Sequence, residues 1–172
     1  AGVTGVTVDN LAAVNAAVAG QTAGTTAQIQ AFATTGGTTA SNAITAIDAY
    51  DGTNTAPTLQ QYVDAGVTGV TVDNLAAVNA AVANQTAGTT AQIQALANTG
   101  GTTASNAITA IDAYDGTGTA PTLQQYVDAG VTGVTDNNLA AVNAAVVDES
   151  AGTTSLIQAL ADTGSTKASD AI

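Results

Sequence analysis

The stretch Pro57-Thr-Leu-Gln-Gln-Tyr-Val-Asp-Ala-Gly-Val-Thr-Gly-Val-Thr-Val-Asp-Asn-Leu-Ala-Ala-Val-Asn79 decides how the chain is interpreted. It returns at Pro121 with two changes near its end, and its tail, Ala-Gly-Val-Thr-Gly-Val-Thr, also opens the chain at Ala1. The offset between copies is 64 residues each time. Self-similarity at a fixed period of this size is typical of repeat architectures.

The 172 residues therefore divide into repeat 1 (1–64), repeat 2 (65–128) and a partial repeat 3 (129–172). Repeats 1 and 2 differ at four positions: Gly20/Asn84, Phe32/Leu96, Thr34/Asn98 and Asn54/Gly118. Because the chain stops within a repeat, we expect it to be a segment of a longer protein. The array, and not a catalytic motif, is the main guide to function.

Charge is scarce and one-sided. Thirteen acidic residues stand against a single basic residue, Lys167, and there is no His, which gives a net charge of −12. Nucleic-acid binding is therefore not expected, because nothing can neutralise phosphates. No apolar run approaches the roughly 20 residues that a membrane span needs, so we expect no membrane insertion. The chain lacks Cys and Met, the commonest oxidation targets, which suits an extracellular setting.

Four short helices are predicted per repeat, taking residues 65–128 as the type. The first covers Val72–Ala83 with Thr71 as its N-cap, and Asn79 on its apolar face would need a hydrogen-bond partner if buried. Thr89 begins the second, which Gly100-Gly101 ends. Thr103 caps the third, which Gly116 ends. Pro121 sits in the first turn of the fourth, which Gly130 closes.

A β interpretation competes with this prediction, because Thr and Val are common in strands and Val67–Val72 alternates briefly. The Ala-rich runs instead have a period near 3.6, which favours helix. The predicted fold class is all-α, with repeats stacked as a solenoid or a rod of helical bundles. A small strand at Val67–Val72 stays open.

One repeat has few large apolar side chains, so we expect a lone repeat to be marginally stable and to bury more surface against its neighbours. The side chains predicted to make this repeat packing are Leu75, Val78, Val82, Ile93, Leu96, Ile108, Ile111, Tyr114, Leu123, Tyr126 and Val127. The expected partner is therefore the protein itself, through neighbouring repeats or identical chains.

Catalysis is not expected, because the usual nucleophile–base pairs need His, Cys or Lys, and the two full repeats contain none of them. No catalytic residue or cofactor is predicted. Asp51 and Asp115, in the segment Asp-Gly-Thr, are weak calcium candidates, since oxygen ligands near a Gly turn suit that ion. The segment lacks the acidic alternation of an EF-hand loop, so a Gly-capped helix end is the simpler interpretation.

The run from Ala56 to Asn79 resembles a repeat of very large bacterial surface adhesins, most closely over Ala-Pro-Thr, Tyr62 and Ala-Gly-Val-Thr-Gly-Val-Thr. The resemblance implies a secreted, non-catalytic stalk built from tandem repeats. We therefore expect an extracellular or cell-surface structural protein, as a stalk or self-associating filament for adhesion or biofilm. The alternative is a multivalent module that binds a surface glycan or protein around Tyr62/Tyr126 and Asp51/Asp115.

Overall fold

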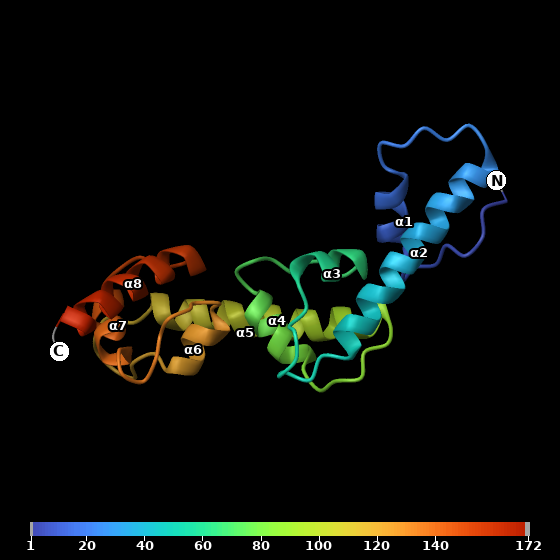
Figure 1. Ribbon diagram of the computed structural model, residues 1–172. Helices are drawn as coiled ribbons and strands as arrows, with labels where there is room; N and C mark the ends of the chain where they lie inside the picture. The colour runs from blue at the N-terminus through green and yellow to red at the C-terminus, as the bar shows by residue number, and fades with distance from the viewer. Residues whose placement is uncertain (1, 171–172) are drawn as a thin grey trace. The chain divides into compact units, whose positions relative to one another are not determined.

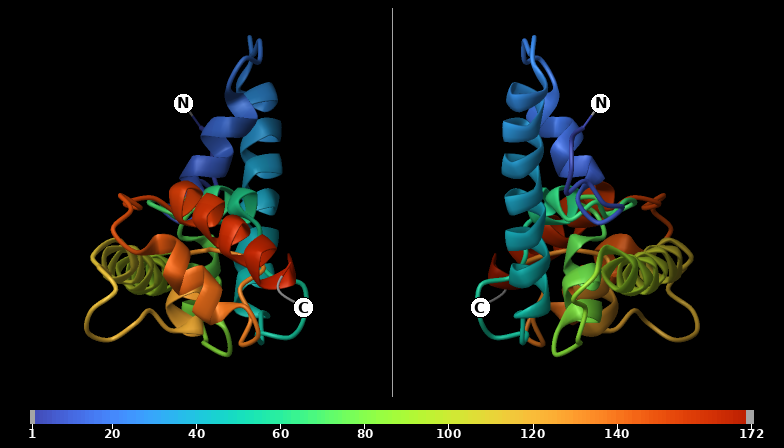
Figure 2. Two further views of the ribbon diagram at one scale, coloured as in Figure 1. Left: turned by 90° about the vertical axis from the view of Figure 1, so that its left-hand side faces the viewer. Right: turned by 90° about the vertical axis from the view of Figure 1, so that its right-hand side faces the viewer.

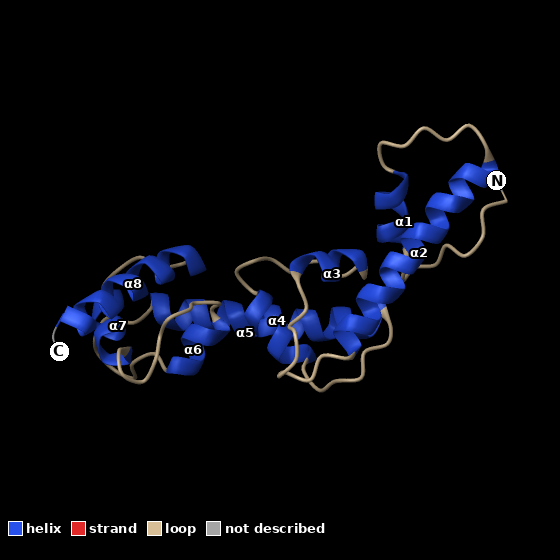
Figure 3. Ribbon diagram, viewed as in Figure 1, coloured by secondary structure: helices blue, strands red, loops and turns tan. Residues whose placement is uncertain are grey.

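The protein is all-helical. The computed structural model describes residues 2–170, and within them it contains eight helices and no strand (Figures 1 and 3). The predicted all-α class is confirmed. The strand considered at Val67–Val72 is wrong, because this segment is a loop in which Gly69 has a φ of +76°, a left-handed conformation that interrupts an extended run.

The helices follow a short–long–short order that recurs along the chain, each beginning 64 residues after its counterpart. They are α1 (Leu11–Val18), α2 (Thr26–Asp48), α3 (Leu59–Asp64), α4 (Leu75–Val82), α5 (Thr90–Asp112), α6 (Leu123–Asp128), α7 (Leu139–Val146) and α8 (Thr154–Asp170). A full repeat thus has three helices, and the prediction of four is wrong.

The error lies at Gly100-Gly101, which do not end a helix but lie in the middle of α5. Neither has a positive φ. A Cβ added to Gly100 would stand 2.5 Å from Val78 Cα and 2.7 Å from the Ala77 carbonyl oxygen. Gly100 therefore lets the backbone of α4 touch that of α5, which no larger residue permits. Gly36 and Gly164 occupy the same position in α2 and α8.

Thr103 does not cap a helix, although it was predicted to. Its Oγ1 donates to the Thr99 carbonyl oxygen within α5 at 3.1 Å. Thr109 Oγ1 likewise donates to the Ser105 carbonyl oxygen at 2.9 Å. Threonine hydroxyls can satisfy themselves on the preceding turn of a helix, so a Thr-rich segment can remain helical where sequence rules suggest a new start.

Of three other residues predicted at helix starts, one is confirmed in that role and two are not. Thr89 is confirmed as a cap, since its Oγ1 accepts from Gln92 N at 3.3 Å. Pro121 lies before its helix and not in the first turn, and Thr122 forms the capping box with Gln125. Thr71 is not a cap, because α4 begins later, at Leu75.

Unit 1, the first of two compact units, comprises residues 2–70 together with Asn79–Asn98. Within it, α1 packs along α2, and α3 also contacts α2 (Figure 2). Its buried apolar residues are Ala13, Val14, Ala33, Ala40, Ala43, Ile47, Tyr62, Ala65, Val67, Val82, Ala87, Ile93 and Ala97.

Unit 2 comprises Thr71–Val78 together with residues 99–170, and in it α7 packs against α8 (Figure 2). Its core consists of Ala107, Ile111, Tyr126, Ala129, Val131, Val142, Val146, Ala151, Ile157 and Ala161. For all but one of these residues, the residue 64 positions earlier is buried in unit 1. The exception is Val142, whose counterpart Val78 belongs to unit 2. The compact units and the sequence repeats are thus different divisions of the chain.

Candidate functional site

In each core a fully buried tyrosine pairs with an asparagine of the next repeat, which is buried in unit 1 and partly buried in unit 2. In unit 1, Tyr62 OH donates to Asn79 Oδ1 at 2.7 Å, and Asn79 Nδ2 donates to the Pro57 carbonyl oxygen at 3.0 Å. Tyr62 is 0% exposed and Asn79 9%. The expectation that a buried Asn79 needs a partner is confirmed. Since a buried polar group without a partner costs about 1–3 kcal/mol, the pair fixes how the repeats meet.

Unit 2 repeats this geometry. Tyr126 OH donates to Asn143 Oδ1 at 2.7 Å, and Asn143 Nδ2 donates to the Pro121 carbonyl oxygen at 3.0 Å. Burial, with a smaller contribution from nearby Tyr114, raises the pKa of Tyr126 to about 12. Burial likewise raises the pKa of Tyr62 far above its usual value. Both hydroxyls therefore stay protonated, and able to donate, at neutral pH.

The aspartate that ends each of the long helices α2 and α5 binds the loop just before the next long helix. Asp48, at the end of α2, accepts a hydrogen bond from Ala87 N at 2.6 Å. Asp112, at the end of α5, accepts one from Ala151 N at 2.5 Å. An ionised acceptor makes a stronger hydrogen bond than a neutral one. The sequence pattern alone did not predict this role for Asp48 and Asp112. The sequence feature that could have indicated this role is that each aspartate directly precedes Ala-Tyr-Asp-Gly.

A threonine at the start of the following long helix completes the junction. In unit 1, Thr90 Oγ1 lies 2.6 Å from the Ala65 carbonyl oxygen and 3.2 Å from that of Asp9. Thr154 in unit 2 lies 2.8 Å from the Ala129 carbonyl oxygen and is 8% exposed. This role was not predicted, because capping alone was expected of the threonines at helix starts.

Most of the side chains predicted to make repeat packing are shielded from solvent. Five are essentially buried: Val78, Val82, Ile93, Ile111 and Tyr126. Five more are partly buried: Leu75, Leu96, Ile108, Tyr114 and Leu123. Ile108, Ile111, Tyr114 and Tyr126 lie in or against the core of unit 2.

Val127 is the exception, since it is 46% exposed and does not pack as predicted. Its neighbour Tyr126 points into the core, and consecutive helical residues lie about 100° apart around the axis, so Val127 faces outward. Val72, predicted to lie in a helix, precedes α4 and is 74% exposed. Its exposure explains why Asp136 stands at the same place in repeat 3.

A ligand surface around Tyr62 and Tyr126 is ruled out by their complete burial, so that expectation is wrong. Asp51 is exposed, but its carboxylate is engaged within its own turn. Asp51 Oδ1 accepts from Thr53 N at 2.8 Å, Thr53 Oγ1 at 2.9 Å and Asn54 N at 2.9 Å. These bonds, the one from Thr53 N foremost, lower the pKa of Asp51.

Asp115 stands in the same turn, accepting from Thr117 Oγ1 at 2.6 Å and from Thr117 N at 2.8 Å, and these bonds lower its pKa. Among residues 2–170, no group of three or more acidic side chains is placed to hold a metal ion. The carboxylates of Asp51 and Asp115 are thus engaged by hydrogen bonds within their own turns.

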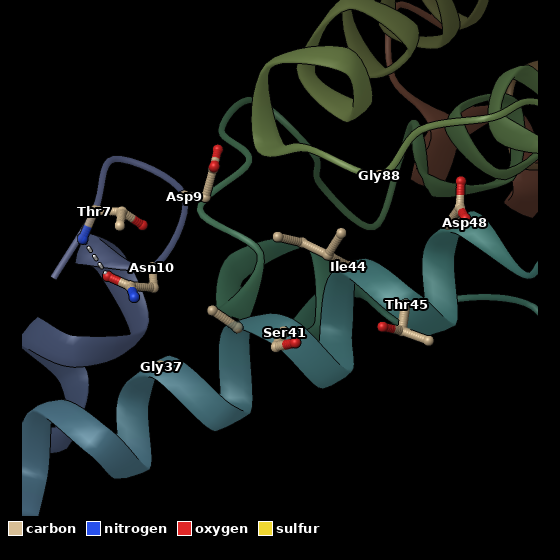
Figure 4. A pocket seen from close by; sticks show the side chains of 10 residues that line it. Thr7, Asp9, Asn10, Gly37, Ser41, Ile44, Thr45, Asp48 and Gly88 are labelled. Atoms are coloured by element: carbon tan, nitrogen blue, oxygen red, sulfur yellow. Dashed lines mark hydrogen bonds between the residues drawn. The ribbon is translucent and has the colours of Figure 1, made fainter. Parts of the chain in front are cut away.

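A shallow polar hollow recurs in both units. In unit 1 it measures about 330 Å³, and Figure 4 shows side chains around it that include Thr7, Asn10, Ser41 and Thr45, with Ile44 between them. In unit 2 the equivalent hollow, about 290 Å³, is lined by Thr71, Asp73, Asn74, Gly101, Ala104, Ser105, Ile108, Thr109 and Gly152. Hydroxyl, amide and carboxylate groups beside an aliphatic side chain are groups that can bind a sugar.

The two carboxylates at the unit 1 hollow already have backbone partners. Asp48 accepts from Ala87 N, as described above, and Asp9 Oδ1 accepts from Thr90 N at 3.3 Å. They therefore bracket the segment around Gly88, which crosses the rim between them (Figure 4).

No helix in the described part of the chain is long and apolar enough to cross a bilayer. Comparisons of the chain with protein-family models, with curated proteins and with solved structures found no match. The case for a function therefore depends on the geometry of the repeats and their junctions.

Proposed function

We propose that this chain is a structural protein of the bacterial cell surface or the extracellular space. Its repeats stack into a solenoid or rod that serves as a stalk or a self-associating filament in adhesion or biofilm. In this arrangement the number of repeats sets the length, and the chemistry of the side chains serves packing and solubility.

The observation that carries this proposal is that each junction uses both halves of the 64-residue period. The second half of repeat 1 supplies Asp48 and Tyr62, and the first half of repeat 2 supplies Asn79 and Ala87. The same contacts recur between repeats 2 and 3 through Tyr126 and its partner. A repeat that depends on its neighbours for half of its core supports continuous stacking, in which each added copy creates one more junction.

The net charge of −12 with one basic residue supports the extracellular setting, since it opposes nonspecific aggregation of an otherwise apolar, Ala-rich chain. The same charge repels nucleic acid, whose phosphates are also negative. The resemblance of Ala56–Asn79 to adhesin repeats points to the same class of protein.

A repeat-number series tests the proposal. Proteins with one, two and three additional copies of residues 65–128 inserted after Asp128 would be imaged by electron microscopy and measured in solution by small-angle X-ray scattering. We expect the contour length to rise by a constant increment per copy. A radius that grows as in a compact globule, or lengths without a constant increment, would refute the stalk.

A second candidate function is multivalent glycan binding, which the recurring hollow favours. It predicts saturable binding of a saccharide with a stoichiometry that rises with repeat number. In that case Ser105→Ala together with Thr109→Ala should remove one site per molecule while helicity is retained. Titration of isotope-labelled protein with neutral and acidic oligosaccharides would show it, and the absence of saturable shifts would remove this candidate.

A further inference from the structure

The polar hollow of unit 1 continues into a second hollow along the same face of α2. The second hollow measures about 470 Å³, and both are lined by Asn10, Gly37 and Ser41. Together they form one trough, the unit 1 trough, which follows α2 from Gln30 to Asp48. These two residues are 18 positions apart, so the trough is about 27 Å long at the rise of an α-helix. That length exceeds a single sugar and suits an extended chain.

The open surface of the trough belongs to the repeat itself. Thr34, Thr38 and Ser41, which line the trough from α2, are exposed. Their counterparts in α5, which a complete repeat precedes in the sequence, are exposed as well: Asn98, Thr102 and Ser105. A preceding repeat therefore leaves this face of the long helix uncovered.

The polar side chains of the trough offer hydrogen-bond acceptors more than donors. Thr34 Oγ1 donates to the Gln30 carbonyl oxygen at 2.9 Å, and Thr38 Oγ1 donates to the Thr34 carbonyl oxygen at 3.0 Å. Gln30 Nε2 donates to the Thr4 carbonyl oxygen at 3.1 Å. A hydroxyl that has given its hydrogen to the helix can still accept through its oxygen. The trough therefore favours a ligand that is rich in donors, as the hydroxyls of a sugar chain are.

The end of the trough beside Gly88 is negatively charged (Figure 4). Asp9 and Asp48 each accept one backbone hydrogen bond through Oδ1, and in the described part of the chain neither Oδ2 has a partner. The single basic side chain of the sequence, Lys167, belongs to unit 2. No described side chain of unit 1 therefore compensates the two carboxylates, and a positively charged group on a ligand would do so.

We propose that the unit 1 trough binds an extended oligosaccharide that carries free amino groups. An ammonium group pairs with the carboxylates of Asp9 and Asp48, and sugar hydroxyls along α2 donate to the hydroxyl oxygens of Thr34 and Thr38. A peptide fits this surface less well, because its backbone carbonyls need donors and the trough offers few. The inference names the ligand class of the glycan-binding candidate and rests on that candidate, whereas the stalk does not depend on it.

The test is isothermal calorimetry of the 172-residue protein with a glucosamine oligosaccharide, with its fully N-acetylated form of the same length, and with an oligolysine. We expect saturable binding of the glucosamine oligosaccharide. The N-acetylated form should bind at least about tenfold more weakly, because a neutral amide replaces the ammonium of a charge-assisted hydrogen bond. Equal affinity for the two saccharides would overturn the amine preference and leave the glycan-binding candidate standing. Tighter binding of oligolysine would overturn the saccharide as ligand, and binding of none of the three would overturn the glycan-binding candidate as well.

Two charge variants locate the site. The first changes four aspartates to Asn, which keeps the Oδ1 acceptors and removes the charges: Asp9 and Asp48 with their counterparts Asp73 and Asp112. It should lose the tenfold preference for the amine. The matched control removes the same charge outside the hollows, through Asn at Asp51, Asp64, Asp115 and Asp128, and should keep the preference. Circular dichroism checks that both variants remain helical. Loss of the preference in the control alone, or equally in both, would show that overall charge attracts the amine and would overturn the proposed site.

Discussion

The crossing of α4 over α5 at Gly100 gives the sharpest prediction. In Gly100→Ala the new Cβ would meet Val78 Cα at 2.5 Å, whereas ordinary contact begins at 3.4 Å. The obstacle is backbone, so α4 must retreat by about 1 Å. Overpacking of this kind costs up to about 3 kcal/mol. The higher helix propensity of alanine stabilises the folded state by about 1 kcal/mol. We therefore expect a net loss of about 2 kcal/mol in the free energy of unfolding.

Gly101→Ala is the matched control. The nearest atom to its added Cβ is Asn74 Nδ2 at 3.6 Å, an ordinary contact. This variant should keep the propensity gain and be up to about 1 kcal/mol more stable than the parent. Urea denaturation of both variants, followed by circular dichroism, compares them directly. If Gly100→Ala proves as stable as Gly101→Ala, the close crossing does not exist. If both lose stability equally, the two glycines end a helix after all.

Four further predictions concern unit 2. Tyr126→Phe should lower the free energy of unfolding by about 1–3 kcal/mol, because Asn143 loses its buried donor. Because burial raises the pKa of Tyr126 from 10.0 to about 12, the folded state holds its proton longer than the unfolded state. Stability should be fully present below pH 10 and fall between pH 10 and 12, less steeply in Tyr126→Phe, as pH-dependent urea titrations would show. Ile111→Ala should cost about 2–5 kcal/mol, whereas Val127→Ala, on an exposed position, should stay within about 0.5 kcal/mol in the same assay. Removing divalent ions with a chelator should leave the melting temperature unchanged, because Asp115 is engaged by Thr117, and a drop of several degrees would restore the calcium hypothesis.

The helical class was predictable from sequence because the apolar residues of α4 and α5 follow helical spacing. The need of Asn79 for a partner was predictable too, since a polar residue on an apolar stripe must be satisfied. The partner itself was not, because Tyr62 lies 17 positions away and local rules carry no such information. The same limitation led to Tyr62 being considered for ligand binding when it is wholly buried.

The long helix was missed for a physical reason. Local propensity disfavours glycine in a helix by about 1 kcal/mol per residue, so Gly100-Gly101 indicate an end. Tertiary packing overrides this, because the contact that Gly100 allows between two backbones outweighs its local cost. The prediction for Thr103 was wrong for a similar reason. Its hydroxyl donates to a carbonyl oxygen of its own helix, whereas the sequence suggested an N-cap. The junctions can be understood only with α5 at its full length. Its first part, up to Asn98, belongs to unit 1, and the part from Thr99 onward belongs to unit 2.

The most direct test of the central claim compares two fragments of equal length and nearly equal composition. One follows the sequence repeat, residues 65–128, and separates Tyr126 and Asp112 from their partners in the next repeat. The other, residues 40–103, is shifted and keeps Tyr62 with Asn79 and Asp48 with Ala87. Thermal unfolding followed by circular dichroism should show a cooperative transition for the shifted fragment and none for the repeat-framed one. A repeat-framed fragment that unfolds cooperatively, at a temperature equal to or above that of the shifted fragment, would contradict the account.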